Sequence, residues 1–331
     1  MKQPATIRST NRLPLVGLIA VRWHFLVASS ILLLAGCSDQ PAGQLEVSKF
    51  DVWVVPRDGS RIPSPRALST ADDDTVYALD NAGRVLVYSP DGKLVQKWHM
   101  PEHDVGRPEG VIRLHDGRVA VADTHYHRVV FFHPDGTVES MIGEKGRGEG
   151  QFVYPVAIEQ DPHGFIYVGE YGDRQRIQKF TANGEFITQF GEQGIEPGQF
   201  QRPSGIIWID GAIYTVDAFN NRIQVFRDTG EFESVLHVTD LEHPDETVAL
   251  DFPYDIRATE DGRLFVVENK GSRITVLNTD GTLVGRYGDP GRGLGQFFNP
   301  WGLTVLSDGR ILVADTGNHR IVELTPAQSG M

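Results

Sequence analysis

The segment GEQGIEPGQFQRP, residues 191–203, has two close copies in the chain. They are GEKGRGEGQFVYP at residues 143–155 and GDPGRGLGQFFNP at residues 288–300, so the pattern G-x-x-G-x-x-x-G-Q-F-x-x-P occurs three times. Glycine-rich loops bind phosphate when a helix follows them, because the free amide groups and the dipole of the helix N-terminus attract anions. A β-rich segment follows each of these three loops instead. The loops are therefore predicted to connect repeated structural units.

The repeated unit is visible in six segments that begin with arginine and continue with apolar residues and a turn. They are RVLVYSPDG from Arg84, RVVFFHPDG from Arg128, RIQKFTANG from Arg176, RIQVFRDTG from Arg222, RITVLNTDG from Arg273 and RIVELTPAQSG from Arg320. Successive arginines are 44, 48, 46, 51 and 47 residues apart. An apolar strand that ends in an acidic residue precedes each arginine, and earlier still a proline opens another short apolar strand. Each unit is thus predicted to form four antiparallel strands, a to d, joined by tight turns.

Six such sheets predict an all-β fold, a six-bladed β-propeller of four-stranded antiparallel blades, because in a ring each sheet can bury both faces against its neighbours. After Arg320 the chain has room for a strand c but not for a strand d. LEVSKFDVWVV, residues 45–55, alternates apolar and polar residues and is predicted to supply that missing outer strand. Closing the ring in this way removes exposed sheet edges. Phe152, Phe200 and Phe297 of the three loops are expected to pack between blades.

An acidic residue at the end of strand b and the arginine that opens strand c recur together in every unit. The pairs are Asp80–Arg84, Asp123–Arg128, Glu170–Arg176, Asp217–Arg222, Glu268–Arg273 and Asp315–Arg320. The two side chains face each other across a turn, where a bidentate ion pair can form. Because a single active site does not need six copies, these pairs are interpreted as structural.

The first 36 residues differ in composition from the rest of the chain. They contain four basic residues and no acidic one, and they end in the apolar run FLVASSILLLAG from Phe25. A run of about a dozen apolar residues is typical of a signal peptide and is too short to span a bilayer. The run leads into Leu34-Ala35-Gly36-Cys37, which resembles the bacterial lipobox, and Cys37 is the only cysteine of the chain.

This resemblance implies that Cys37 is acylated and becomes the N-terminus of a lipid-anchored protein. We therefore expect a lipoprotein signal peptide at residues 1–36, a lipidated cysteine and tether at residues 37–44, and the propeller at residues 45–331. The expected location is the bacterial cell envelope, facing the periplasm. Ser38 favours the outer membrane, because in signals of this kind an aspartate after the cysteine favours the inner one. With a single cysteine, no disulfide can form within the chain.

The charge of the chain limits its partners. The 331 residues include 31 Lys and Arg against 44 Asp and Glu, a net charge of −13, and removal of residues 1–36 would make the charge still more negative. Because a surface this acidic repels phosphate groups, we expect no nucleic-acid partner. Hydrophobic residues make up 40% of the chain, which is typical of a globular protein. A monomeric propeller is expected.

A resemblance to a known family lies in the turns between strands b and c. ADTGNHRI, residues 314–321, contains Asn318-His319-Arg320 and resembles the signature of NHL repeats, and DAFNNRIQVF, residues 217–226, is similar. The resemblance implies a six-bladed propeller, in agreement with the six units counted above. It implies little about activity, because propellers include enzymes, protein-binding modules and RNA binders.

The residues that follow the proline of each strand a are not repeated, and they should surround one mouth of the central channel. They are Arg66, Glu109, Val156, Ser204, Tyr254 and Trp301. All except the valine are candidates for binding a small polar or peptide-like ligand. The alternative is a plugged channel with a purely structural role. The divergent connections at residues 99–108 and 237–253 flank this mouth and are expected to contact a partner.

The residues after the strand-a prolines also test whether the chain could be a zinc-dependent lyase. Amidating lyases that cleave peptidyl-hydroxyglycine are distantly similar to this family, and they bind a catalytic zinc through histidines at three starts of strand a. The matching positions here hold no histidine, and Glu109 alone cannot bind zinc. No cofactor is predicted, although calcium or zinc remains open.

Two other groups of residues are candidate metal ligands. His125 and His127 lie in one b–c turn with Glu170 as a possible third ligand, but His127 occupies the position of His319 in the NHL signature, which favours a structural role. Asp72 to Asp74 form an acidic turn between strands a and b, without the full spacing of a calcium loop.

The sequence therefore favours a non-enzymatic protein: a membrane-anchored periplasmic binding or scaffold propeller. We expect it to recognise an envelope protein, peptide or glycan through the face that carries the long loops. The alternative is a metal-dependent lyase or hydrolase that acts on a small ligand at the mouth of the central channel.

Overall fold

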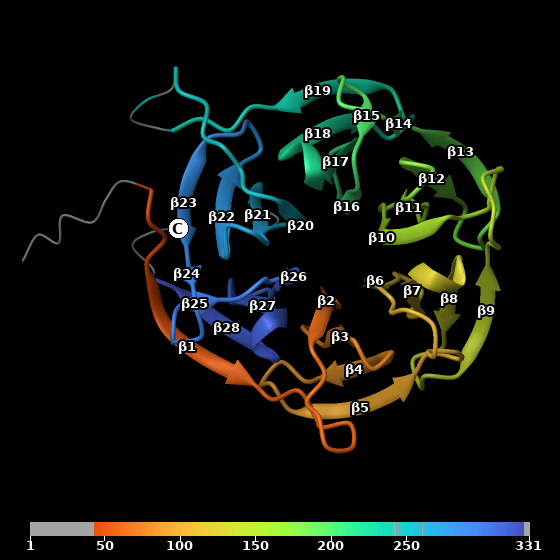
Figure 1. The fold of residues 1–331 in the computed structure, drawn as a ribbon, viewed down its shortest axis with the longest axis horizontal. Coiled ribbons are helices and arrows are strands. Elements are labelled where there is room, and N and C mark those ends of the chain that lie inside the picture. The colour runs from red at the N-terminus through yellow and green to blue at the C-terminus, as the bar shows by residue number, and fades with distance from the viewer. Residues whose placement is uncertain (1–42, 241–242, 244, 260, 328–331) are drawn as a thin grey trace, which may run out of the picture. The chain divides into compact units, whose positions relative to one another are not determined.

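The computed structural model describes residues 43–327 apart from 241–242, 244 and 260. Six sheets of four antiparallel strands stand around a ring, with one strand of each sheet at the centre and one at the rim (Figure 1). The predicted all-β, six-bladed β-propeller is confirmed. The proposed signal peptide and Cys37 lie outside the described residues. Within the described part of the chain, no helix has the length and apolar composition needed to cross a membrane.

The strands of each blade are given from the centre to the rim. Blade 1 contains β2 (Pro65–Thr70), β3 (Val76–Asp80), β4 (Arg84–Tyr88) and β5 (Leu94–His99). Blade 2 contains β6 (Gly110–Arg113), β7 (Val119–Asp123), β8 (Arg128–Phe132) and β9 (Val138–Ile142). Blade 3 contains β10 (Tyr154–Gln160), β11 (Ile166–Tyr171), β12 (Arg176–Phe180) and β13 (Phe186–Phe190).

Blade 4 contains β16 (Pro203–Ile209), β17 (Ala212–Asp217), β18 (Arg222–Arg227) and β19 (Phe232–Leu236). Blade 5 contains β20 (Pro253–Ala258), β21 (Arg263–Glu268), β22 (Arg273–Asn278) and β23 (Leu283–Tyr287). Blade 6 contains β26 (Gly302–Val305), β27 (Ile311–Asp315), β28 (Arg320–Pro326) and β1 (Val47–Trp53). Three single-turn 3₁₀ helices, η1 (Thr124–Tyr126), η2 (Ala218–Asn220) and η3 (Thr316–Asn318), form b–c turns.

The two faces of the ring differ in their connections. One face, the loop face, carries the b–c turns and the long connections from each outer strand to the next inner strand. The other, the hairpin face, carries the short a–b and c–d turns. Every inner strand runs from the loop face to the hairpin face, so the residue after its proline lies at the loop-face end of the central channel and its last residues lie at the hairpin-face end.

The core lies between the blades. Strands b and c are buried on both sides, as in β3, β4 and β7, where every residue is buried, whereas outer strands such as β5 and β9 are largely exposed. The three repeated loops add a phenylalanine each to this core, because Phe152, Phe200 and Phe297 have no exposed surface. These rings pack directly on the first glycine of each loop, where a side chain would overlap the ring. The pattern G-x-x-G-x-x-x-G-Q-F is therefore a packing motif.

The N-terminal strand closes the ring as predicted. β1 pairs with β28 in antiparallel register from Val47 opposite Pro326 to Trp53 opposite Ile321. The Trp53 indole is 4% exposed, and its Nε1 donates a hydrogen bond to Glu323 Oε2 at 2.8 Å. It also packs on Tyr88 of blade 1, with ring centroids 5.6 Å apart. The strand thus completes blade 6 and ties it to blade 1.

The six acid–arginine pairs are all formed. Blade 4 shows their arrangement: Asp217 accepts a hydrogen bond from Arg222 Nε at 2.8 Å and another from the backbone N–H of Gln201 at 2.6 Å. Arg222 Nη2 in turn donates to the backbone carbonyls of Glu196 and Gln199 at 2.9 and 2.8 Å. Each pair therefore fastens the incoming loop to the blade.

This bonding differs in part from the predicted bidentate geometry. Only Arg273 and Glu268 join two nitrogens to two different carboxylate oxygens. In other blades a terminal nitrogen of the arginine donates to a loop carbonyl, as in Arg176 and Arg320, while in blade 2 Arg128 Nη1 donates to the carboxylate of Glu102.

Replacing Trp53 by alanine is expected to lower the free energy of unfolding by about 3–5 kcal/mol, the usual cost of truncating a buried tryptophan. Urea denaturation followed by circular dichroism measures this. Val95→Ala on the rim strand β5 is the control, because Val95 is 61% exposed and its removal should leave stability unchanged. Equal stability of the two variants would contradict the role of β1 in closing the ring.

Replacing the buried Asp217 by alanine is expected to cost about 3–5 kcal/mol, because the half-buried Arg222 guanidinium then lacks its carboxylate partner. Burial raises the pKa of Asp217, while the hydrogen bonds from Asn220, Gln201 and Arg222 oppose that rise. Asp173→Ala is the matched control, since Asp173 pairs with Arg147 at the exposed surface. Similar losses for both aspartates would show that the buried pair is no more important than a surface pair.

Candidate functional site

Four of the predicted ring residues meet at the loop-face end of the channel. Glu109 Oε1 accepts a hydrogen bond from Arg66 Nη2 at 3.0 Å. Its other oxygen accepts from the Tyr254 hydroxyl and from Arg202 Nη2, each at 2.9 Å. Arg66 lies over the ring of Trp301, 4.0 Å from its centroid, and Trp301 packs on Tyr254 with centroids 4.6 Å apart. The residues are therefore in contact and hydrogen-bonded to one another.

These contacts close the channel at the loop face. The space that remains among the ring residues is about 20 Å³, which is room for about one water molecule. We call Arg66, Glu109, Arg202, Tyr254 and Trp301 the plug. This arrangement matches the plugged channel that the sequence analysis left open as an alternative, and it differs from an open ligand pocket.

The other two ring positions do not join this network. Val156 is buried between blades. Ser204 lines the small remaining space, and its Oγ is buried without a hydrogen-bond partner. The structure therefore brings Ser204 near the plug without giving it a contact that would fix its role.

Two members of this region were missed by the sequence analysis. Arg202 precedes Pro203, outside the positions predicted to face the channel, and its backbone has a positive φ of 71°. That conformation directs its side chain to Glu109 and over the ring of Tyr171, 4.0 Å from the centroid. Tyr171 is the last residue of β11 in blade 3, where the acid–arginine spacing is one residue longer. An arginine directly before a strand-a proline was the available signal.

Charge and burial fix the protonation of two members of the plug, Tyr254 and Arg202. Burial raises the pKa of Tyr254 well above its ordinary value, and the nearby charge of Glu109 raises it further. Tyr254 thus remains a phenol that donates to Glu109. Burial alone would lower the pKa of Arg202, but the interactions with Tyr254 and Glu109 outweigh it and raise that pKa.

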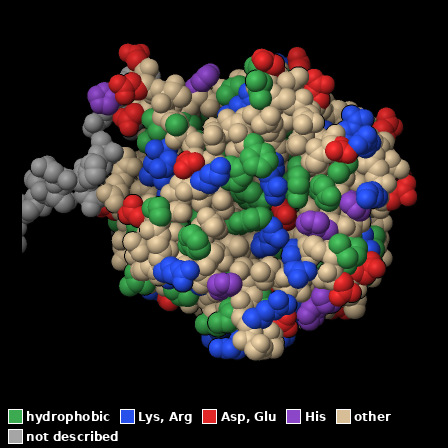
Figure 2. Space-filling view, in the orientation of Figure 1, with side chains coloured by type: hydrophobic (Ala, Val, Ile, Leu, Met, Phe, Trp, Pro, Cys, Tyr) green, Lys and Arg blue, Asp and Glu red, His purple; other side chains and the backbone are tan. Residues whose placement is uncertain are grey.

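An aromatic row leads from the plug to the surface. Phe219 packs on Phe252 and Phe252 on Tyr254, with centroids 5.2 and 6.1 Å apart. Phe219 is 55% exposed, and Lys270 lies over Phe252 at 4.8 Å. Figure 2 shows the loop face, on which hydrophobic and basic side chains gather around the centre while most acidic side chains lie nearer the edge.

The candidate metal ligands near blade 2 have other partners. His127 has a positive φ of 58° and its Nδ1 hydrogen-bonds to the carbonyl of Val153. His125 Nδ1 accepts from the backbone N–H of Arg107 at 3.3 Å. Glu170 accepts from Arg176 and from the backbone N–H of Val153. Within the described ranges, no group of three or more His, Cys, Asp or Glu side chains is arranged to hold a metal ion.

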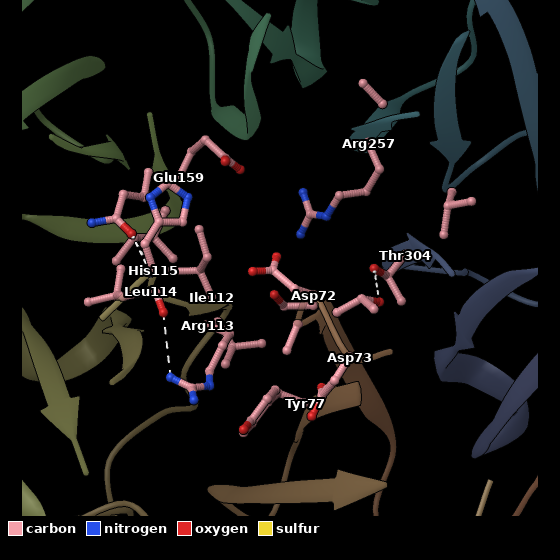
Figure 3. A pocket seen from close by; sticks show the side chains of 18 residues that line it. Asp72, Asp73, Tyr77, Ile112, Arg113, Leu114, His115, Glu159, Arg257 and Thr304 are labelled. Carbon is pink, nitrogen blue, oxygen red and sulfur yellow. Dashed lines mark hydrogen bonds between the residues drawn. The ribbon is translucent and has the colours of Figure 1, made fainter. Parts of the chain in front are cut away.

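The larger hollow of the channel lies at the hairpin face, where the sequence analysis placed only the turn at residues 72–74. It has a volume of about 400 Å³ and is lined by the ends of five inner strands, β2, β6, β10, β20 and β26. Figure 3 shows Glu159 and Arg257 projecting into it from different blades, with Asp72 between them in this view. Sequence periodicity does not reveal this cavity, because it depends on how far opposite strand ends stand apart.

Known proteins resemble the chain in sequence and in fold. The family model for the NHL repeat matches residues 297–324. NHL repeat-containing protein 3 of Mus musculus is 28% identical over 216 residues, 60% of this chain and 59% of that protein. Peptidyl-glycine alpha-amidating monooxygenase of Mus musculus is 25% identical over 196 residues, 53% of this chain and 18% of that protein. The match thus spans less than two thirds of the length of these curated relatives.

The solved structure of a gluconolactonase from Xanthomonas campestris superimposes with a TM-score of 0.61 at 13% identity, covering 87% of this chain and 99% of that one. At that identity the likeness concerns the fold alone. The repeat count, the turn sequences and the matched repeat agree with one another: the chain is a six-bladed β-propeller that carries an NHL repeat at residues 297–324 and is similar to NHL repeat-containing proteins.

Proposed function

We propose that the protein is a lipid-anchored binding module of the bacterial envelope, and that it recognises an acidic segment of a partner protein at the centre of its loop face. The observation that carries this proposal is the aromatic row, which exposes Phe219 at the surface and continues inward to the plug. Exposed aromatic side chains beside cations are typical anchors of protein interfaces.

The charge of this region supports an acidic partner. Glu109 is the one acidic residue of the plug, and two arginines pair with it. Lys270 is exposed above Phe252 and has no ion-pair partner among the described residues. The centre of the loop face is therefore positive in a chain whose net charge is −13. Such a contrast orients a partner toward one patch, because complementary potentials steer association.

Anchoring and location rest on the sequence. The export signal and the cysteine at position 37 would leave a short tether before the first strand, β1, which begins at Val47. A protein segment is favoured over a glycan because the exposed positive charge calls for a charged ligand.

The enzymatic alternative places a metal ion at the mouth of the channel. The plug offers that ion a single carboxylate, Glu109, both of whose oxygens already accept hydrogen bonds from Arg66, Arg202 and Tyr254. A metal would have to displace two arginines to bind there. The geometry of the plug therefore fits a rigid structural base beneath a binding surface better than it fits a catalytic metal site.

Peptide binding tests the proposed surface. A labelled peptide that alternates aspartate with leucine is expected to bind at least about tenfold more tightly than the same peptide with lysine in place of aspartate. Binding should weaken when salt is raised from about 50 to about 300 mM, because exposed charges are screened. The double variant Phe219→Ala/Lys270→Ala should lose this binding. Fluorescence anisotropy measures both effects.

The control for this experiment is Val95→Ala, which also removes exposed apolar surface but lies on the rim strand β5. It should bind the acidic peptide as the wild type does. Equal affinity for the two peptides, or unchanged binding by the double variant, would refute the proposed surface. Tighter binding of single-stranded RNA at the same positions would replace the protein partner with a nucleic acid.

Elemental analysis separates the two functions. After dialysis without chelator, the purified protein is expected to contain no stoichiometric zinc or calcium, because both Glu109 oxygens are already engaged within the plug. One metal ion per chain that disappears in Glu109→Gln would instead favour the lyase or hydrolase.

A further inference from the structure

The cavity at the hairpin face has the size and shape of a small-molecule site. Its volume of about 400 Å³ lies within the usual range of ligand pockets. The plug fills the opposite end of the channel, so the cavity is a pocket with one mouth rather than a tunnel. It is separate from the proposed protein-binding surface, and neither proposal depends on the other.

A carboxylate stands in the cavity without an ionic partner. Glu159 is the last but one residue of β10, and it makes no ion pair within 4.0 Å among the described residues. Burial raises the pKa of Glu159 to about 7, and the charge of Arg257 only partly opposes this. The ionised form of this carboxylate has lost part of the solvation of water, which is costly, and its backbone hydrogen bond from Gln160 supplies no positive charge. A ligand cation would remove that cost.

A fixed guanidinium faces the same space. Arg257 of β20 is held on one side by Asp255 Oδ1 at 2.9 Å and by the carbonyl of Leu68 at 3.0 Å. Its group projects into the cavity in Figure 3, across from Glu159. The two opposite charges are too far apart to pair directly. Arg113, the other arginine of the wall, turns to carbonyls of its own hairpin.

The rest of the wall is mixed. Tyr77, Ile112 and Ile158 supply apolar surface, and Thr70 hydrogen-bonds to Thr304 at 2.6 Å on the opposite side. A ligand with only a negative charge would leave Glu159 without an ionic partner, and a ligand with only a positive charge would leave Arg257 with Asp255 as its carboxylate partner and no contact to the ligand. A ligand with both charges and an apolar side chain complements Glu159, Arg257 and the apolar part of the wall.

We propose that this cavity binds a small zwitterion, an amino acid or a dipeptide, whose ammonium group pairs with Glu159 and whose carboxylate pairs with Arg257. Charge-assisted hydrogen bonds of this kind give both affinity and orientation. The apolar wall then contacts the side chain of the ligand.

Calorimetric titration of the full protein tests the site with four probes. Leucine and alanyl-leucine carry both charges, N-acetyl-leucine carries only the negative one, and leucine amide only the positive one. The two zwitterions are expected to bind, and each single-charge analogue should bind at least about tenfold more weakly, since it loses the charge-assisted hydrogen bonds to either Glu159 or Arg257. Equal binding of leucine and leucine amide would overturn the proposal, as would the absence of binding by both zwitterions.

Glu159→Gln should weaken leucine binding by at least about tenfold, because it removes one charge without changing the size of the side chain. Glu185→Gln is the matched control: it makes the same change on an exposed turn of the same blade and should bind as the wild type does. A second variant, Ala258→Phe, fills the cavity from its wall and should abolish binding whatever the charge. Unaltered binding in Glu159→Gln, with the fold intact by circular dichroism, would overturn the proposal.

The titration of Glu159 gives an independent readout. The charged and titratable groups around it are Arg257, Asp255, Asp161, Asp72, Asp73, Arg113 and His115. Because the pKa of Glu159 is raised to about 7, its ionised fraction grows as the pH rises through that value. Leucine should therefore bind more tightly at about pH 8 than at about pH 6. Glu159→Gln should lose this difference and His115→Gln should keep it; the reverse pattern would refute the role of Glu159.

Discussion

The ring is held together by a buried ion pair that is repeated once in each blade. In blades 3 to 6 the acidic residue that ends strand b accepts a hydrogen bond from the backbone of the incoming loop. In most blades the paired arginine also donates to carbonyls of the chain that enters the blade. Each blade is thereby fixed to its neighbour at the same point, which places every inner strand at a defined height along the channel.

With the inner strands fixed in this way, the two ends of one channel acquire opposite properties. At the loop face, long side chains of different blades reach one another and pair, so the end is filled by the plug. At the hairpin face, Glu159 and Arg257 remain apart and leave a cavity between them. The same scaffold thus offers a flat, positive and aromatic surface on one side and a concave, mixed-charge pocket on the other. These two shapes suit different ligands, a protein segment and a small zwitterion.

Much of the architecture could be predicted from the sequence alone, because the same pattern of strands and turns occurs six times and each copy supports the assignment of the others. The six blades, the closing strand at residues 45–55 and the burial of Phe152, Phe200 and Phe297 all followed from spacing and alternation. The site was harder to predict. The positions after the strand-a prolines did meet, but Arg202 entered the plug from a neighbouring position through a positive φ. Phe252 and Asn299 have a positive φ at the same position of blades 5 and 6, so the backbone conformation repeats, whereas the arginine that reaches Glu109 from it is particular to blade 4.

The sequence by itself determined the fold, because the pattern of apolar strands, turns and acid–arginine pairs admits one closed ring, and each copy of the pattern supports the others. The tertiary structure alone decided which unrepeated residues touch across that ring. Arg66, Glu109 and Tyr254 lie far apart along the chain, so only the packing of the blades could show that they pair. Likewise, only the packing could show that Glu159 and Arg257 do not form an ion pair. The distance between them depends on the width of the channel, which is set by the twist and tilt of all six blades together.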